Sequence, residues 1–167
     1  GKCTPATFQP LLPSGSSVLF TTSIPTNGTF VENSANAGSP VEVTTLPALC
    51  AAKFTIPTSN CSTIDVALFL PDRWNQRLMA VGNGGFGGYI NWPDLGQYSH
   101  YGFAGMSTNT GHYSGAVDAS WALNNPEAII DWGHRAIHES TLISKGIIEA
   151  YYGARSRYNY FSSCSNG

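Results

Sequence analysis

The sequence has little charge, no cluster of basic residues and no long apolar run. Only 11% of its 167 residues are Asp, Glu, Lys or Arg, with 8 basic against 10 acidic side chains. Without a Lys/Arg cluster there is no electrostatic footprint for a phosphate backbone, so nucleic acid is not an expected partner. No stretch of about 18 apolar residues exists to span a membrane. The opening residues Gly1-Lys2-Cys3-Thr4 lack the apolar core of a secretory signal, so we expect that any signal peptide has been removed.

The composition that is present favours a folded, secreted protein without a membrane partner. A hydrophobic content of 42% is enough for a packed core. Four cysteines suit an oxidising compartment, where disulfides persist. Asn27-Gly28-Thr29 and Asn60-Cys61-Ser62 both match the N-glycosylation acceptor pattern. We therefore expect glycans at Asn27 and Asn60 and an extracellular location, against the alternative of a cytosolic enzyme with scattered thiols.

The order of predicted elements indicates an α/β fold. Short strands are predicted at 18–22, 41–45, 62–70, 78–81, 101–107 and 158–162, the last of them buried, with loops at 25–28 and 33–40. A long helix is predicted from a cap at Asn125 to a stop at Gly153. Alternation of this kind is typical of helices covering a largely parallel sheet. Residues 1–167 would be the N-terminal portion of one catalytic domain, with a β-rich extension at 1–50 and the start of the core at 51–167.

The long helix contains two glycines and two histidines that need separate interpretation. Gly133 and Gly146 each cost about 1 kcal/mol relative to Ala, which favours close packing against a sheet. His134 and His138 have metal-ligand spacing, but no third ligand is evident, and we expect no metal site. Asp131 is interpreted as a helix-surface residue, and Asp118 as a solubilising loop residue.

A predicted strand ends in a turn of the form small-x-Ser-x-Gly, which is typical of a catalytic nucleophile. The residues are Ser163, Cys164, Ser165, Asn166 and Gly167. In α/β-hydrolases the nucleophile lies on a strained turn after a strand, and small residues on either side let the chain pass itself closely. Ser165 is therefore the candidate nucleophile, and a surface turn in a Ser-rich stretch is the alternative.

A glycine-rich loop follows an earlier strand, as an oxyanion-binding loop does. The run 82–88 reads Gly-Asn-Gly-Gly-Phe-Gly-Gly and follows the strand at 78–81. Such a loop supplies a backbone N–H that stabilises the tetrahedral oxyanion, together with the N–H after the nucleophile. The predicted donors are Gly84, Gly85 and Asn166. All four histidines precede Ser165, whereas the base follows the nucleophile in this class.

Four segments together resemble the tannase and feruloyl esterase family. They are the run 74–78 (WNQRL), AVGNGGFGG at 80–88, DWGHRAIHESTLISKGIIEAYYG at 131–153, and YFSSCSNG at 160–167. The resemblance extends from about Cys50 to Gly167. It implies an α/β-hydrolase core with a lid inserted further along the polypeptide, and hydrolysis of phenolic esters. Feruloyl esterase activity is the first expectation, and tannase activity on galloyl esters is the second.

The resemblance also implies how the cysteines and the remaining catalytic residues are arranged. It supports a Cys3–Cys50 disulfide, and it implies a disulfide from Cys164 to a cysteine outside this chain, next to the catalytic histidine. That histidine and its acid would belong to the remainder of the same polypeptide. No catalytic cofactor is implied, although a structural calcium ion in the lid would fit the family. Cys61 has no assigned partner.

One feature departs from the family, and one alternative comes from another class of protein. The family usually has Gly where this chain has Ser163, so the turn is expected to differ slightly in shape. Trp92 and Tyr89 near the glycine loop could, as exposed aromatics, face a phenolic ring, but core packing is the preferred interpretation because it accounts for most aromatic residues. A secreted carbohydrate-binding module without catalytic activity is the alternative function, although it leaves the capped helix and the Cys-Ser turn unexplained.

Overall fold

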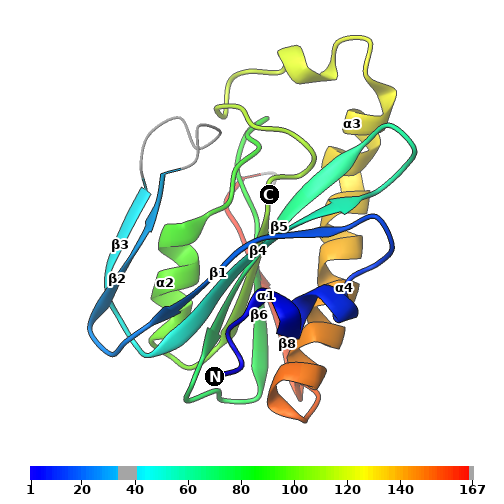
Figure 1. The fold of residues 1–167 in the computed structure, drawn as a ribbon. Helices are drawn as coiled ribbons and strands as arrows, with labels where there is room; N and C mark the ends of the chain where they lie inside the picture. Colours follow the sequence, from blue (N-terminus) through cyan, green and yellow to red (C-terminus); the bar gives the residue numbers. More distant parts are fainter. Residues whose placement is uncertain (34–40, 166–167) are drawn as a thin grey trace.

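The computed structural model describes residues 1–33 and 41–165, and these form a sheet with helices on both faces (Figure 1). The predicted loop at 33–40 therefore lies almost wholly outside the described residues. The six strands of the main sheet follow the order β1-β4-β5-β7-β6-β8. Their bounds, in that order, are Ser17–Ile24, Leu49–Pro57, Thr63–Pro71, Ala104–Thr108, Arg77–Val81 and Tyr158–Ser162. Strands β2 (Gly28–Glu32) and β3 (Val41–Leu46) form a separate antiparallel pair.

The predicted α/β class is confirmed, but the sheet is mixed. Strands β7, β6 and β8 pair in parallel, whereas β1, β4 and β5 are joined by antiparallel ladders, and β5 is also antiparallel to β7. Four strands therefore run in one direction, and β1 and β5 run against them. The parallel part of the sheet is the part that carries the predicted catalytic segments.

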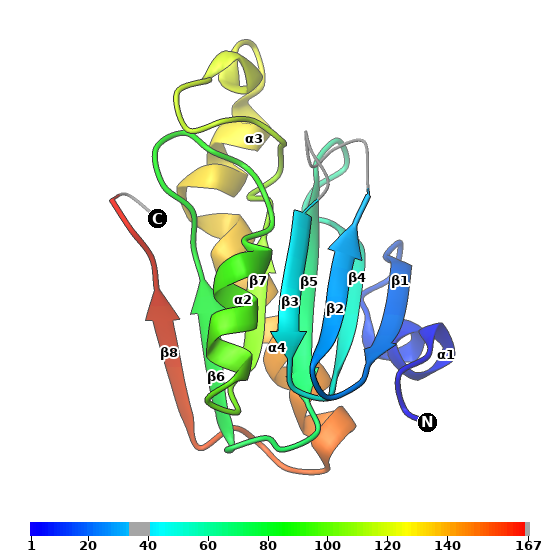
Figure 2. The same ribbon diagram turned by 90° about the vertical axis from the view of Figure 1, so that its left-hand side faces the viewer.

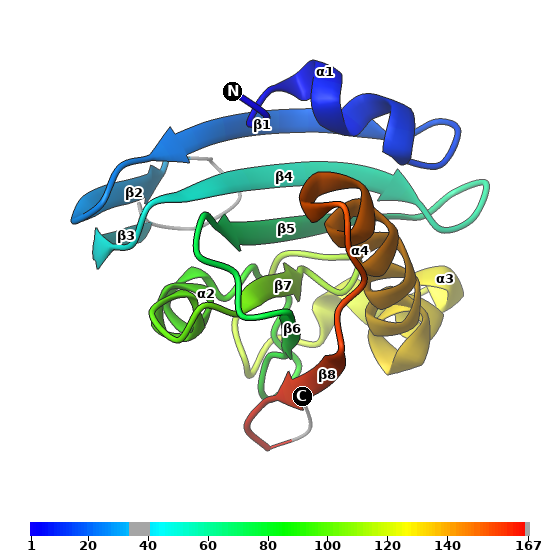
Figure 3. The same ribbon diagram turned by 90° about the horizontal axis from the view of Figure 1, so that it is seen from below.

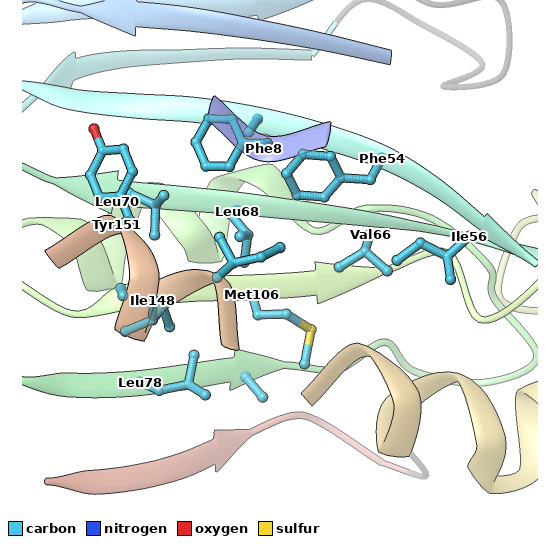
Figure 4. Packing of buried hydrophobic residues seen from close by; sticks show 14 of the residues in the cluster. Phe8, Phe54, Ile56, Val66, Leu68, Leu70, Leu78, Met106, Ile148 and Tyr151 are labelled. Carbon is cyan, nitrogen blue, oxygen red and sulfur yellow. The ribbon is translucent and has the colours of Figure 1, made fainter. Parts of the chain in front are cut away.

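Each face of the sheet packs against its own helices (Figures 2 and 3). Helix α4 (Ala136–Tyr152) and the short α1 (Pro5–Phe8) cover one face, and α2 (Trp92–Ser99) covers the other beside β2 and β3. Alternate side chains of β5 enter the two cores, with Leu68 on the α4 side and Phe69 on the α2 side. Figure 4 shows the α4-side core, in which Phe8, Phe54 and Tyr151 meet.

The predicted long helix is present with the predicted ends, but its geometry changes inside. The Asn125 side chain accepts a hydrogen bond from Ala128 N, Pro126 opens the helix, and Gly153 ends it at a φ of 73°. Between α3 (Pro126–Ile130) and α4 lies a π-helical turn, Asp131–Arg135. A π turn adds a residue and shifts the phase of the faces. Consistent with that shift, Ile129 is 48% exposed although Ala136, two helical turns further along, is fully buried.

Two interpretations of residues in this helix were wrong. Asp131 is buried rather than exposed, because its carboxylate accepts hydrogen bonds from Thr58 and Ser62 and pairs with Arg135. Gly133 and Gly146 do not pack closely, since a Cβ added at either would meet no atom of the described residues within 4 Å.

Two strands and two helices were missed, and one strand was placed in the wrong environment. Strands β2 and β4 and helices α1 and α2 were not predicted, although the Asn91 cap and Pro93 are start signals that would have identified α2. Strand β8 is exposed along most of its length, because β6 is its only partner among the described residues. The remaining elements are two 3-10 turns, Gln9–Leu11 and Ser120–Ala122. None of the described helices is long and apolar enough to cross a bilayer.

Candidate active site

Strands β6 and β8 bring the glycine loop and the Ser165 turn to the same edge of the sheet. They are parallel neighbours, so their carboxyl ends meet at that edge (Figure 2). Val81 is in register with Ser162, and the next peptide is tied across by a hydrogen bond of 3.0 Å from Gly82 N to Ser162 O. The two segments that the sequence singled out are therefore adjacent.

Ser165 has the backbone conformation expected of a nucleophile on a tight turn. Its φ is 60°, in the left-handed region that residues with a Cβ rarely adopt. Strain of this kind is concentrated at functional sites, where the surrounding chain holds it in place. Ser165 is exposed and lies three residues after the end of β8.

The glycine loop forms a turn that passes close to Ser165. A hydrogen bond of 3.2 Å from Gly87 N to Gly84 O closes the turn, and Gly85 has a φ of 59°. A Cβ on Gly84 would lie 3.4 Å from Cys164 O and 4.0 Å from Ser165 Cβ. The loop backbone and the serine turn are thus nearly in van der Waals contact.

Two consecutive N–H groups of this loop are available to a ligand. Within the described part of the chain, neither Gly84 N–H nor Gly85 N–H donates a hydrogen bond. Adjacent free donors beside a serine are what a developing oxyanion requires. Asn166, the third predicted donor, lies outside the described residues.

The second loop, residues 109–121 after β7, supports the glycine turn through hydrogen bonds. The sequence analysis did not predict this role. The Phe86 carbonyl accepts hydrogen bonds from His112 Nε2 at 3.0 Å, Ser114 Oγ at 3.2 Å and Trp121 Nε1 at 3.1 Å. The Phe86 N–H donates to Ala116 O at 2.8 Å. Three donors on one carbonyl fix the orientation of that peptide, and with it the turn.

The imidazole of His112 is a structural group in this arrangement. Its ring stacks on Trp121 with the ring centres 3.8 Å apart. Burial lowers the pKa of His112 below its ordinary 6.5, although the Phe86 carbonyl and Asp118 oppose the shift. Because Nε2 faces a carbonyl, it must donate its proton there, so His112 is not placed to act as a base.

The other three histidines lie apart from the Ser165 turn. His100 follows α2 and lines a cavity with Arg73 and Gly102, before the amino end of β7. His134 and His138 line a groove of about 610 Å³ with Phe161 of β8. Across residues 1–33 and 41–165, no three His, Cys, Asp or Glu side chains gather as a metal site would need.

A buried ionic network anchors the second loop to the sheet. Lys53 Nζ lies 2.6 Å from Glu32 Oε1 and 3.7 Å from Asp65 Oδ2. Asp65 also accepts a hydrogen bond from the Tyr113 hydroxyl. Burial raises the pKa of Tyr113 well above 10, and the Asp65 carboxylate raises it further. The loop that supports the glycine turn is thereby fixed to β4 and β5.

The two aromatic residues near the glycine loop differ in exposure. Trp92 is only 1% exposed and packs on Phe30 and Phe69, so it belongs to the core, as preferred, and the alternative of an exposed ligand contact was wrong for this residue. Tyr89 is 38% exposed and lines a cavity of about 250 Å³ together with Tyr113.

Two cysteines are paired and two are free, and both predicted glycosylation sites are exposed. Cys3 and Cys50 form a disulfide, and Cys61 and Cys164 are free and exposed. Asn27 lies in the turn between β1 and β2, and Asn60 in the turn between β4 and β5, and both side chains are exposed.

Sequence comparisons agree with this geometry. The family model described as tannase and feruloyl esterase matches residues 51–167. A probable feruloyl esterase B-2 from Aspergillus flavus is 37% identical over 150 residues, which are 89% of this chain and 28% of that protein. Feruloyl esterase B from Aspergillus niger is 34% identical over 71% of this chain and 22% of its own length. The chain thus spans less than a third of the length of these relatives.

Solved structures show the same fold. An esterase from Aspergillus oryzae superposes with a TM-score of 0.86 at 27% identity, over 100% of this chain and 33% of that one. Feruloyl esterase B from the same species gives 0.81 at 27% identity, over 98% and 31%. A tannin acyl hydrolase from Aspergillus niger gives 0.70 at 20% identity, over 99% and 32%, and shares the fold. On these grounds the chain belongs to the tannase and feruloyl esterase family.

Proposed function

We propose that this chain carries the nucleophile and oxyanion site of a serine esterase that hydrolyses phenolic esters. One observation carries the proposal: Ser165, in a left-handed conformation, lies against the glycine loop at Gly84, and in this loop the N–H groups of Gly84 and Gly85 donate no hydrogen bond within the described part of the chain. Nucleophile and oxyanion donors are the two parts of an acyl-transfer site that a scaffold must hold together.

The reaction proceeds in two steps. Ser165 Oγ attacks the ester carbonyl while its proton passes to a histidine, and the carbonyl oxygen becomes an oxyanion held by Gly84, Gly85 and Asn166 N–H. Collapse of this intermediate expels the alcohol, which takes the proton from the histidine. Water then attacks the acyl enzyme by the same route, releasing the acid and restoring Ser165. No cofactor takes part.

The base and its acid come from residues outside positions 1–167. Within the described residues no histidine hydrogen-bonds Ser165, and His112 is committed to the Phe86 carbonyl. Relatives about three times as long have room for both groups and for a lid, with or without a structural calcium ion. We also propose that exposed Cys164 forms a disulfide with a cysteine of that remainder, next to the catalytic histidine.

Hydroxycinnamoyl esters are the proposed substrates, and galloyl esters are the second candidate. The relatives at 30–37% identity are named feruloyl esterases, whereas the tannin acyl hydrolase is similar in fold alone. The test is turnover of methyl ferulate and methyl gallate by the complete polypeptide and by its Ser165→Ala variant. We expect faster hydrolysis of the ferulate and none by the variant. A Ser165→Ala variant that keeps its turnover would sink the proposal, and faster hydrolysis of the gallate would favour the tannase alternative.

We propose that the protein is secreted and N-glycosylated at Asn27 and Asn60. The exposed positions of both side chains and the Cys3–Cys50 disulfide support this. Treatment of the native protein with a peptide N-glycosidase should convert both residues to Asp, and unchanged peptide masses would contradict the assignment.

A further inference from the structure

Ser163 joins the serine turn to the glycine loop through its side chain. It follows β8, and its Oγ donates a hydrogen bond of 2.9 Å to Asn83 O. Glycine, the residue that the family resemblance leads one to expect here, has no group to make this bond. The departure from the family pattern therefore adds a specific contact.

The Asn83 carbonyl belongs to the same peptide group as Gly84 N–H. A trans peptide is planar, and its C=O and N–H point in opposite directions, so a bond that holds the carbonyl also fixes the N–H. The next peptide is held in the same way, because Gly84 O accepts from Gly87 N and this fixes Gly85 N–H. Ser163 is the residue of the serine turn whose side chain bonds to the first of these two peptides.

We propose that Ser163 is a positioning residue, whose hydroxyl fixes the Asn83–Gly84 peptide and with it the Gly84 N–H that would stabilise the oxyanion formed at Ser165. This inference rests on the proposed esterase function. Because the bond connects the nucleophile's own turn to the donor peptide, it keeps the distance between attacking oxygen and donor constant. Such a contact matters more in the transition state than in the ground state, since the oxyanion is the species that needs the aligned donor.

The test compares side chains that keep or lose the hydroxyl in the complete polypeptide. Ser163→Ala and Ser163→Gly lose it, and Ser163→Thr keeps it. Removal of a whole oxyanion donor lowers kcat by about 100- to 1,000-fold, so loss of its alignment should lower kcat by about 5- to 20-fold with KM nearly unchanged. Ser163→Thr should recover most of the rate. An aryl boronic acid, which forms a tetrahedral adduct at the nucleophile, should bind Ser163→Ala more weakly by a similar factor.

Ser162→Ala is the matched control, because it removes a neighbouring hydroxyl that bonds to Tyr98 instead of to the loop. The proposal is overturned if Ser163→Ala and Ser163→Gly keep full kcat, if Ser163→Thr fails to recover activity lost in Ser163→Ala, or if Ser162→Ala loses as much. Ser163→Gly carries the test if Ser163→Ala does not fold. Failure of the Ser163 proposal can be distinguished from failure of the proposed esterase function, because in the second case Ser165→Ala would remain active.

Discussion

A methyl group at position 85 should disable the oxyanion loop while leaving the protein folded. A Cβ built on Gly85 lies 2.3 Å from Ala116 O and 2.9 Å from Ala116 Cβ, and the φ of 59° is unfavourable for Ala. The left-handed conformation alone costs about 1–2 kcal/mol. The contact with Ala116 cannot relax by a rotamer change, because both sides are backbone or Cβ, so the glycine turn must move.

The expected losses in stability and in rate are of different size. The free energy of unfolding should fall by about 1–3 kcal/mol, which leaves a domain of ordinary stability folded. Displacing one oxyanion donor should lower kcat by about 100-fold or more, with KM changed little. Steady-state kinetics on methyl ferulate and urea denaturation of the complete polypeptide measure the two quantities.

Gly115→Ala is the control for this experiment. Gly115 is the neighbour of Ala116, the residue that a Cβ at position 85 would strike. A Cβ on Gly115 itself meets no described atom within 4 Å. We expect both kcat and stability to remain close to wild type in this variant. A Gly85→Ala variant with kcat within about threefold of wild type would show that the glycine turn does not carry an oxyanion donor, and an equal loss in Gly115→Ala would show that the contact with Ala116 is not the cause.

Three further predictions concern the elements that support the site. Trp121→Phe keeps an aromatic ring but loses the N–H that donates to Phe86 O at 3.1 Å and to Asp118 O at 2.9 Å, and should lower kcat about three- to tenfold. Trp132→Phe, in the same aromatic cluster, should not, and equal effects would contradict the supporting role of the Trp121 N–H. Replacing Cys3 and Cys50 by Ser opens a loop of sequence separation 47 and should lower the free energy of unfolding by about 4 kcal/mol, read from urea midpoints; an unchanged midpoint would contradict this. Burial lowers the pKa of His112 below 6.5 in the folded state, so the unfolded chain binds the extra proton first and stability falls as the pH drops through that value; His112→Gln should make this slope shallower between about pH 7.5 and 5, and an unchanged slope would count against the assignment.

The sequence predicted those helices and strands whose ends and spacing are determined by residues close together in the chain. The long helix has its cap at Asn125 and its stop at Gly153 as expected, because capping depends on neighbours in sequence. Strand β4 was missed because Ala51, Ala52 and Lys53 have low strand propensity, and its stability comes from pairing on both sides and from the Glu32 partner of Lys53. The π turn has no sequence signature of this kind.

In the candidate site, too, the local motifs were predictable and the contacts between distant residues were not. The serine turn and the glycine loop were identifiable because each motif has a strand before it and small residues within it. The supporting contacts of His112, Trp121 and Ser163 were not, since they join residues 26 to 80 positions apart and depend on how the loops fold over the sheet edge. The sequence did not separate buried Trp92 from exposed Tyr89 for the same reason, because the β2–β3 pair that buries Trp92 is distant in sequence.

If Ser165 is an activated nucleophile, it should react covalently with an electrophilic probe that mimics an ester. The complete polypeptide is treated with a fluorophosphonate probe, digested, and the modified residue located by mass spectrometry, with Ser165→Ala as the control. We predict a single phosphonylated serine at position 165, formed in native protein and absent after denaturation or in the variant. Modification at another serine, or none at all in protein that turns over methyl ferulate, would contradict the account.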